Sequence, residues 1–261
     1  MGVYKEAVNK IRMNSFLLSE LVKRDFKKKY KRTILGVGWS VLSPLMMLLV
    51  MRVVFTRFFG NNMEHYTTYL FCGILIFNFF NDSTNQGMFS LIENAGVITK
   101  INVPKWVFLL SKNIQVLINF AITLVVFFLF CIIDKITFTW RFIFLIYGIV
   151  CILIFNFGAG LILSAMFVFF RDTQYLWNIF TQILMYMSAI FYPVDTFSPR
   201  TQMIFKLNPV FLYINYFRRI VMYAEIPSLK YHGAMLAVSI LFVLVGYGIY
   251  RKCNHEFLYY M

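Results

Sequence analysis

The chain has 261 residues, of which 60% are hydrophobic and only 14% are charged, and its mean hydropathy is +0.71. Because soluble domains carry about a quarter charged residues, this composition excludes a water-soluble enzyme and a disordered chain. The 25 Lys and Arg outnumber the 11 Asp and Glu and give a net charge of +14. We interpret this excess as topology-setting charge that contacts anionic headgroups, not as a nucleic-acid surface.

The first predicted element is a basic amphipathic helix over residues 17–32. Its apolar side chains fall on one side of the helix: Leu17, Leu18, Leu21, Val22 and Phe26. Its basic side chains fall on the other: Lys23, Arg24, Lys27, Lys28 and Lys31. A helix of this kind lies in the membrane surface. The alternative is that the charges only fix the orientation of the spans.

Six charge-free runs follow, at residues 33–51, 66–81, 113–133, 142–170, 173–194 and 233–250. Roughly 20 apolar helical residues cross a hydrocarbon core of about 30 Å. The runs therefore predict an all-α integral membrane protein, a single domain over 1–261 with six transmembrane helices. With the N-terminus in the cytoplasm, sixteen of the 25 Lys and Arg fall on the inner side, so both termini are predicted to be cytoplasmic.

Two connecting segments are unusual. Residues 87–105 carry their own helical pattern and form an internal loop. Residues 193–232 are broken by Pro199, Pro209 and Pro227 but remain aromatic and apolar. We expect this stretch to form two short helices that dip into the outer leaflet, where irregular backbone must be buried in protein or line a wet cavity.

Catalytic and cofactor motifs are missing from the sequence. Residues 36–38 (Gly-Val-Gly) lack the lysine of a phosphate-binding loop, so ATP hydrolysis is not expected on this chain. The four cysteines show no C-x-x-C spacing and the three histidines are isolated, which disfavours a metal site and a disulfide framework. Asp82 is the one acid placed near membrane depth, and it is the feature on which an ion- or proton-coupled carrier would depend. The pattern fits half of a pore that takes its energy from another subunit.

Several segments resemble type-2 ABC exporter permeases, the membrane subunits that export O-antigen, teichoic acid and capsular polysaccharide. The matching segments are residues 24–44, 94–104, 170–172 (Phe-Arg-Asp), 191–193 (Phe-Tyr-Pro) and 208–209 (Asn-Pro). The resemblance runs from about residue 17 to 250. It implies a homodimer in a bacterial cytoplasmic membrane, joined to two separate ATPase subunits that hold ATP and Mg²⁺. The substrate it implies is a lipid-linked polysaccharide.

The resemblance also assigns roles by position. Residues 17–32 correspond to an interface helix, residues 88–101 to a coupling helix and residues 195–225 to external gate helices. The residues expected to couple to the ATPase are Glu93, Asn94, Lys100, Arg171 and Asp172. For Glu93 and Lys100, the alternative is an ordinary solvated helix face.

Aromatic and basic residues are the candidates for substrate contact. Phe77, Phe79, Phe80, Tyr186 and Phe191 would line the channel, with lipid or core packing as the alternative for each. Arg52 and Arg57 would receive a lipid pyrophosphate or snorkel to the interface. Arg218 and Arg219 would contact a phosphate, an acidic sugar or outer headgroups.

Three other functions compete with this interpretation. A type-2 ABC exporter of a small hydrophobic drug or lipid has the same architecture. An ion-coupled carrier would need Asp82, and a membrane-embedded enzyme would need a catalytic set that the sequence does not show.

Overall fold

The computed structural model describes residues 2–31, 33–59, 65–101, 103–254 and 256–260, with the backbone alone for residues 2–13, 51, 55–59, 195 and 258. All regular secondary structure in these ranges is helical, and the ranges contain no strand. The α-helices are α1 Gly2–Tyr30, α2 Trp39–Phe59, α3 Tyr66–Phe89, α4 Ala95–Ile98, α5 Trp106–Ile133, α6 Phe144–Phe169, α7 Thr173–Met187, α8 Pro199–Leu207, α9 Pro209–Val221, α10 Leu229–Cys253 and α11 Phe257–Tyr260.

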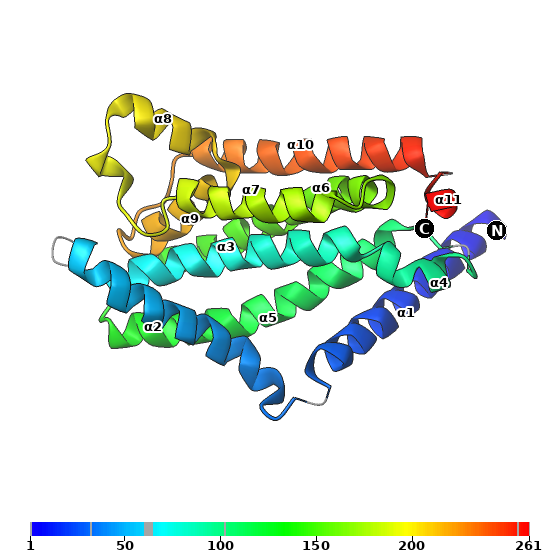
Figure 1. Ribbon diagram of the computed structural model, residues 1–261, viewed down its shortest axis with the longest axis horizontal. Coiled ribbons are helices and arrows are strands. Elements are labelled where there is room, and N and C mark those ends of the chain that lie inside the picture. The colour runs from blue at the N-terminus through cyan, green and yellow to red at the C-terminus, as the bar shows by residue number, and fades with distance from the viewer. Residues whose placement is uncertain (1, 32, 60–64, 102, 255, 261) are drawn as a thin grey trace.

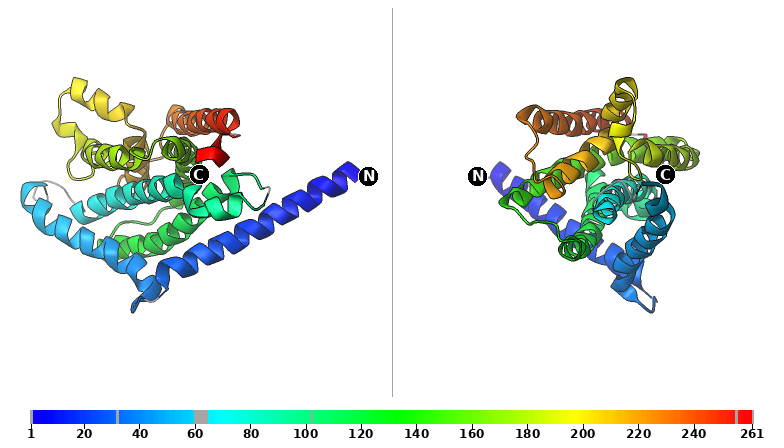
Figure 2. Two further views of the ribbon diagram at one scale, coloured as in Figure 1. Left: turned by 45° about the vertical axis from the view of Figure 1, so that its right-hand side comes forward. Right: turned by 90° about the vertical axis from the view of Figure 1, so that its left-hand side faces the viewer.

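The long helices α3, α5, α6, α7 and α10 run roughly along the long axis of the molecule (Figure 1). The start of α1 lies with α4 and α11 at one end, which we call the terminal end. The helices α8 and α9 lie at the other end, which we call the far end. The helices α1 and α2 meet in a V, and this corner projects from the bundle (Figure 2). The connections between successive members of the set α3, α5, α6, α7 and α10 alternate between the terminal end and the far end.

The core is centred on α3, which contacts α2, α5, α6, α7 and α9. Its aromatic side chains from Tyr66 to Phe80 are almost fully buried, with Phe79 stacked on Phe120 of α5 at a ring-centroid distance of 4.3 Å. The pair α6 and α10 packs by close backbone approach. A Cβ on Gly158 would lie 2.5 Å from the backbone carbon of Phe242, and a Cβ on Gly246 would lie 2.8 Å from the Gly158 carbonyl oxygen. Small residues at such crossings are typical of helices that pack within a membrane.

Four helical stretches in the described ranges are long and apolar enough to cross a membrane: Gly36–Val54, Trp106–Ile133, Trp140–Phe169 and Leu229–Cys253. The helix α3 is long enough, but its second half is polar. The structure thus supports a multi-pass membrane protein, with four spans by length and apolarity alone instead of the six predicted.

The predicted span over residues 173–194 is the clearest disagreement. The helix α7 stops at Met187 after 15 residues, which rise only about 22 Å. Beyond its end, Ala189 adopts a left-handed conformation with φ +49°, a conformation that an α-helix cannot continue through. The charge-free run is therefore a short helix followed by an irregular segment.

The basic amphipathic helix also differs from the prediction. The helix α1 begins at Gly2, well before residue 17, and ends at Tyr30. Its apolar side packs against α5, and Leu21 is 4% exposed in a cluster with Leu91, Phe108 and Phe257. The basic side chains Lys23, Arg24, Lys27, Lys28 and Lys31 are exposed. Within residues 17–31, the apolar and the basic side chains thus lie on the two sides that the sequence predicts, but the apolar stripe packs on the chain itself.

Candidate functional site

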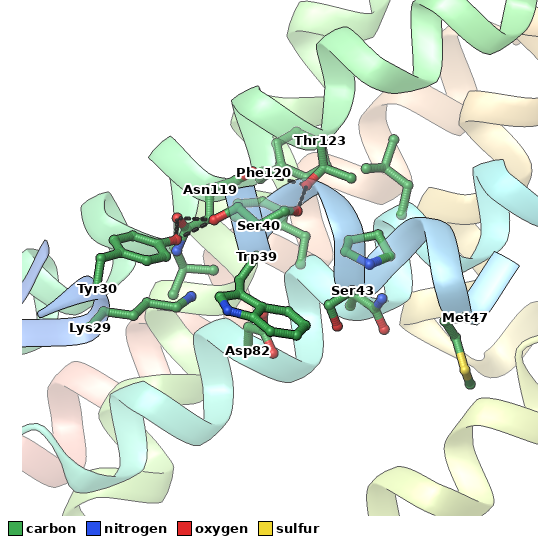
Figure 3. A pocket seen from close by; sticks show the side chains of 15 residues that line it. Lys29, Tyr30, Trp39, Ser40, Ser43, Met47, Asp82, Asn119, Phe120 and Thr123 are labelled. Carbon is green, nitrogen blue, oxygen red and sulfur yellow. Dashed lines mark hydrogen bonds between the residues drawn. The ribbon is translucent and has the colours of Figure 1, made fainter. Parts of the chain in front are cut away.

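A polar cavity of about 590 Å³ opens at the corner between α1 and α2 (Figure 3). We call it the corner cavity. Its polar lining comes from four helices: Lys29 and Tyr30 of α1, Ser40 and Ser43 of α2, Asn78 and Asp82 of α3, and Asn119 and Thr123 of α5. Trp39 supplies an exposed ring to the same lining.

Hydrogen bonds fix one wall of the corner cavity. The Tyr30 hydroxyl donates to Asn119 Oδ1 at 2.6 Å and contacts the Ser40 hydroxyl, and the Thr123 hydroxyl donates to the Ser40 carbonyl oxygen at 3.2 Å. Asn119 is 8% exposed, and its Nδ2 has no hydrogen-bond partner within the described residues. A buried donor without a partner is costly. The cavity therefore offers an amide donor, a carboxylate, hydroxyls and an aromatic face to a ligand.

A polar stripe along α5 connects this cavity to the terminal end. Lys112, Gln115, Asn119 and Thr123 recur every three or four residues, so they share one face of the helix. Gln115 donates to the Asp25 carbonyl oxygen at 3.1 Å. The stripe is therefore the surface against which α1 and the start of α2 pack.

Lys112 is the centre of a charge cluster at the terminal end. Its ammonium lies 3.1 Å from Asp25 of α1 and 2.7 Å from Glu93 of the segment 88–101. The Lys112 and Asp25 side chains are 9% and 3% exposed, so this pair is desolvated. Arg24 lies 2.7 Å from Asp25 and donates to Asn94 Oδ1 at 2.7 Å. The cluster thus ties α1, α5 and the segment 88–101 together.

Within the segment 88–101, the structure places a 3₁₀ turn over Ile92–Asn94 and the single-turn helix α4. Asn94 is 1% exposed, and its Nδ2 donates to the Ser90 carbonyl oxygen at 2.7 Å. Its amide is therefore used inside the chain. Glu93 keeps 43% of its side chain exposed, and Lys100 is exposed.

Arg171 and Asp172 lie at the terminal end between α6 and α7, and both are exposed. Arg171 donates to the Tyr260 carbonyl oxygen of α11 at 3.4 Å and lies 5.1 Å from the Phe167 ring centre. The exposed coupling candidates, Lys100, Arg171 and Asp172, thus occupy the same end of the molecule as the charge cluster.

Arg218 and Arg219 separate at the far end. Arg218 is 3% exposed and donates to the carbonyl oxygens of Ala189 at 2.8 Å, Ile190 at 3.0 Å and Tyr69 at 3.2 Å. Arg219 points outward, 3.4 Å from Glu225. Arg218 is therefore an internal anchor for the irregular segment after α7.

Arg52 is exposed near the end of the candidate span that closes at Val54. The side chain of Arg57 lies outside the described residues.

The predicted channel aromatics divide into four buried side chains and one exposed side chain. Phe77, Phe79, Phe80 and Phe191 are at most 5% exposed and pack within this chain, whereas Tyr186 on α7 is 57% exposed. For Phe77, Phe80 and Phe191, the structure favours core packing, the alternative that the sequence left open. Phe79 is also buried, but it lines the corner cavity.

The sequence reasoning missed three residues: Asp25, Lys112 and Asn119. Asp25 stands alone among basic residues, and Lys112 directly precedes a charge-free run. The i, i+4 spacing of Gln115, Asn119 and Thr123 was a visible signal for a polar face inside an apparently apolar span. Among the described residues, no group of three His, Cys, Asp or Glu side chains could hold a metal ion.

Comparisons with known proteins agree with this architecture. The family model described as ABC-2 type transporter matches residues 17–222. Two proteins from Klebsiella pneumoniae, each named O-antigen export system permease protein RfbA, are 27% and 26% identical over 92% of this chain and 93% of their own lengths. A protein of the same name from Myxococcus xanthus is 24% identical over 92% of this chain and 94% of its own length.

Proposed function

The chain belongs to the ABC-2 type transporter family, and from this premise we propose that it is the membrane-spanning permease subunit of an exporter of lipid-linked polysaccharide. The observation that carries the proposal is the nearly end-to-end similarity to three O-antigen export permeases. The membrane is the cytoplasmic membrane of a bacterium.

The proposed assembly is a homodimer of six-span subunits. The helix α3, and the helix α7 together with the irregular segment that follows it, add to the four apolar spans, and the terminal end, with both termini, faces the cytoplasm. The outer face of α7 is the surface proposed to contact the second copy, because its apolar residues Leu176, Ile179 and Ile183 are more than half exposed. The helices α8 and α9 then form the external gate, where they dip into the outer leaflet.

The energy comes from ATP and Mg²⁺ on two copies of a separate ATPase subunit. The charge cluster supports this division of labour. Because Lys112 joins α1, α5 and the segment 88–101, a push on that segment moves the interface helix and a span together as a rigid body. Glu93, Lys100, Arg171 and Asp172 are the side chains placed to meet the ATPase.

The polar part of the corner cavity supports a glycan as the substrate, and Pro44, Met47 and Leu75 are among the apolar residues of the same lining. Sugar hydroxyls need many donors and acceptors, and the cavity supplies Asp82, Asn78, Asn119 and Ser43. The Trp39 ring offers a flat face for the C–H groups of a sugar, and Lys29 offers a charge for a phosphate of the lipid carrier. We therefore place the sugar-phosphate end of the substrate in this cavity at entry.

Replacing Asp82 by asparagine or Trp39 by alanine is expected to lower export roughly tenfold, the effect of losing about 1.4 kcal/mol of binding. Neither side chain appears in the hydrogen bonds that fix the cavity wall, so the protein should still fold. The measurement is the amount of glycan at the surface of cells that carry each variant as the sole copy, normalised to permease in the membrane fraction.

Trp140→Ala is the matched control, because Trp140 is 69% exposed and lies outside the cavity. It should leave surface glycan at the wild-type amount. Full export by both cavity variants would remove the corner cavity from the substrate path. A deletion strain that keeps its surface glycan but becomes sensitive to amphiphilic drugs would favour the drug-exporter alternative.

A further inference from the structure

A second cavity lies at the far end, apart from the corner cavity, and has a volume of about 650 Å³. We call it the far-end cavity. Its wall comes from the start of α3, the irregular segment after α7, the helices α8 and α9, and the start of α10. A volume of this size suits a sugar unit with an attached charged group.

Cations dominate the charge of this lining. Lys206 of α8 is exposed, Arg219 of α9 is half-buried, and Arg218 forms part of the floor. Within the described part of the chain, Glu225 is the only acid of the lining, and it lies 3.4 Å from Arg219. An anion that enters the cavity therefore meets an excess of positive charge, with one carboxylate to displace.

The remaining lining matches a sugar. The side-chain nitrogen of Asn215 donates to the Tyr231 hydroxyl at 3.3 Å, and that of Gln202 donates to the Phe197 carbonyl oxygen at 3.0 Å. Both bonds use the amide nitrogen and leave the amide oxygen as an acceptor for a ligand. The Tyr223 side chain is 55% exposed and offers an aromatic face. Amide oxygens accept hydrogen bonds from hydroxyls, and aromatic rings pack against the apolar faces of sugars.

The rigidity of the lining supports ligand binding, in addition to its composition. Arg218 is locked by carbonyl oxygens of α3 and of the irregular segment, so the floor of the cavity is fixed before a ligand arrives. The Tyr231 hydroxyl donates to the Leu212 carbonyl oxygen at 2.8 Å and fixes the wall between α9 and α10. A preorganised site loses less conformational entropy when it binds.

We propose that the far-end cavity binds a phosphorylated sugar, with Lys206 and Arg219 on the phosphate and with Asn215, Gln202 and Tyr223 on the sugar. The choice of a sugar phosphate rests on the proposed function. Glu225 competes with the phosphate for Arg219. This competition lowers the affinity of the site, so the ligand is released readily.

The test uses the full-length chain in nanodiscs of phosphatidylcholine, with glucose 1-phosphate as the probe and the apparent melting temperature as the readout. Wild-type protein should be stabilised in a saturable way. Lys206→Gln and Arg219→Gln should each raise the half-saturating concentration roughly tenfold, the effect of one lost charge-assisted contact. Glu225→Gln should lower it, which a purely structural role of these residues would not produce. Lys230→Gln, an exposed cation outside the lining, should leave it unchanged.

Three outcomes overturn the proposal. The first is no stabilisation of the wild type, and the second is equal stabilisation by unphosphorylated glucose. The third is loss of the effect when phosphatidylglycerol is added to the nanodisc, which would assign the site to lipid headgroups. Because the readout needs no transport, a failed export assay with intact binding would count against the proposed function alone.

Discussion

Replacing Lys112 by methionine is expected to lower the stability of the chain by about 2–3 kcal/mol, because it leaves a buried carboxylate without its cation. Removal of one partner from a buried ion pair costs about 3–5 kcal/mol, and Arg24, which still lies 2.7 Å from Asp25, offsets part of that cost. In a chain of this size, such a loss lowers the apparent melting temperature by roughly 5–10 °C. The measurement is thermal unfolding of the purified chain in detergent.

The matched variants make this prediction specific to the pair. Lys100→Met removes an exposed cation of the same end and should stay within about 0.5 kcal/mol of the wild type. The double variant Asp25→Asn with Lys112→Met should recover much of the loss, because no buried charge is then unpaired. Glu93→Gln should cost less than about 1 kcal/mol, because Lys112 still pairs with Asp25 in that variant. If Lys112→Met unfolds at the temperature of Lys100→Met, the charge cluster does not hold the helices together.

Replacing Arg218 by methionine should destabilise the far end by about 3 kcal/mol. The guanidinium donates to the carbonyl oxygens of Ala189 and Ile190 in the irregular segment. The Tyr69 hydroxyl, which donates to the Ala189 carbonyl oxygen at 3.2 Å, still does so in the variant, but the Ile190 carbonyl oxygen loses the guanidinium donor. A buried carbonyl left unpaired costs about 1–3 kcal/mol, and the lost hydrogen bonds to a charged group add to that cost. The neighbouring Gly73 shows how closely the group is fitted, since a Cβ there would lie 2.9 Å from Arg218 Nη2. The expected result is a lower melting temperature and a lower yield of folded protein after solubilisation.

Arg219→Met is the matched control, because its side chain is 38% exposed and its pair with Glu225 is long at 3.4 Å. It should change stability by no more than about 0.5 kcal/mol. Arg218→Lys should recover only part of the loss, since an ammonium cannot reproduce the forked geometry of a guanidinium. Equal melting temperatures for the two methionine variants would contradict the anchoring role of Arg218.

The sequence predicted the helices best where charge-free runs coincide with helix length. The runs 142–170 and 233–250 correspond to α6 and α10 within a few residues. The charge-free runs are shorter than the helices where a charged residue lies inside a helix. The helix α5 begins at Trp106, ahead of Lys112, whose charge is paired by two carboxylates, and α3 continues past Asp82 to Phe89.

The end of α7 could not be predicted from local sequence. Nothing near Ala189 requires a left-handed residue, and the carbonyl oxygens exposed by the break are satisfied by Arg218, about 30 positions later in the chain. The functional residues show the same limit. The resemblance pointed to Arg24, Glu93 and Asn94, but only the tertiary structure brings in Asp25, the partner of Arg24, and Lys112, the partner of Glu93.

If this chain moves a lipid-linked glycan with energy supplied by a separate ATPase, the movement can be followed in proteoliposomes that contain the chain and its ATPase partner, with a fluorescent lipid-linked oligosaccharide and an external quencher. ATP should make the fluorophore inaccessible to the quencher only when both proteins are present. Glycan movement by the chain alone, or ATP hydrolysis by the complex with no movement of the glycan, would overturn this division of labour.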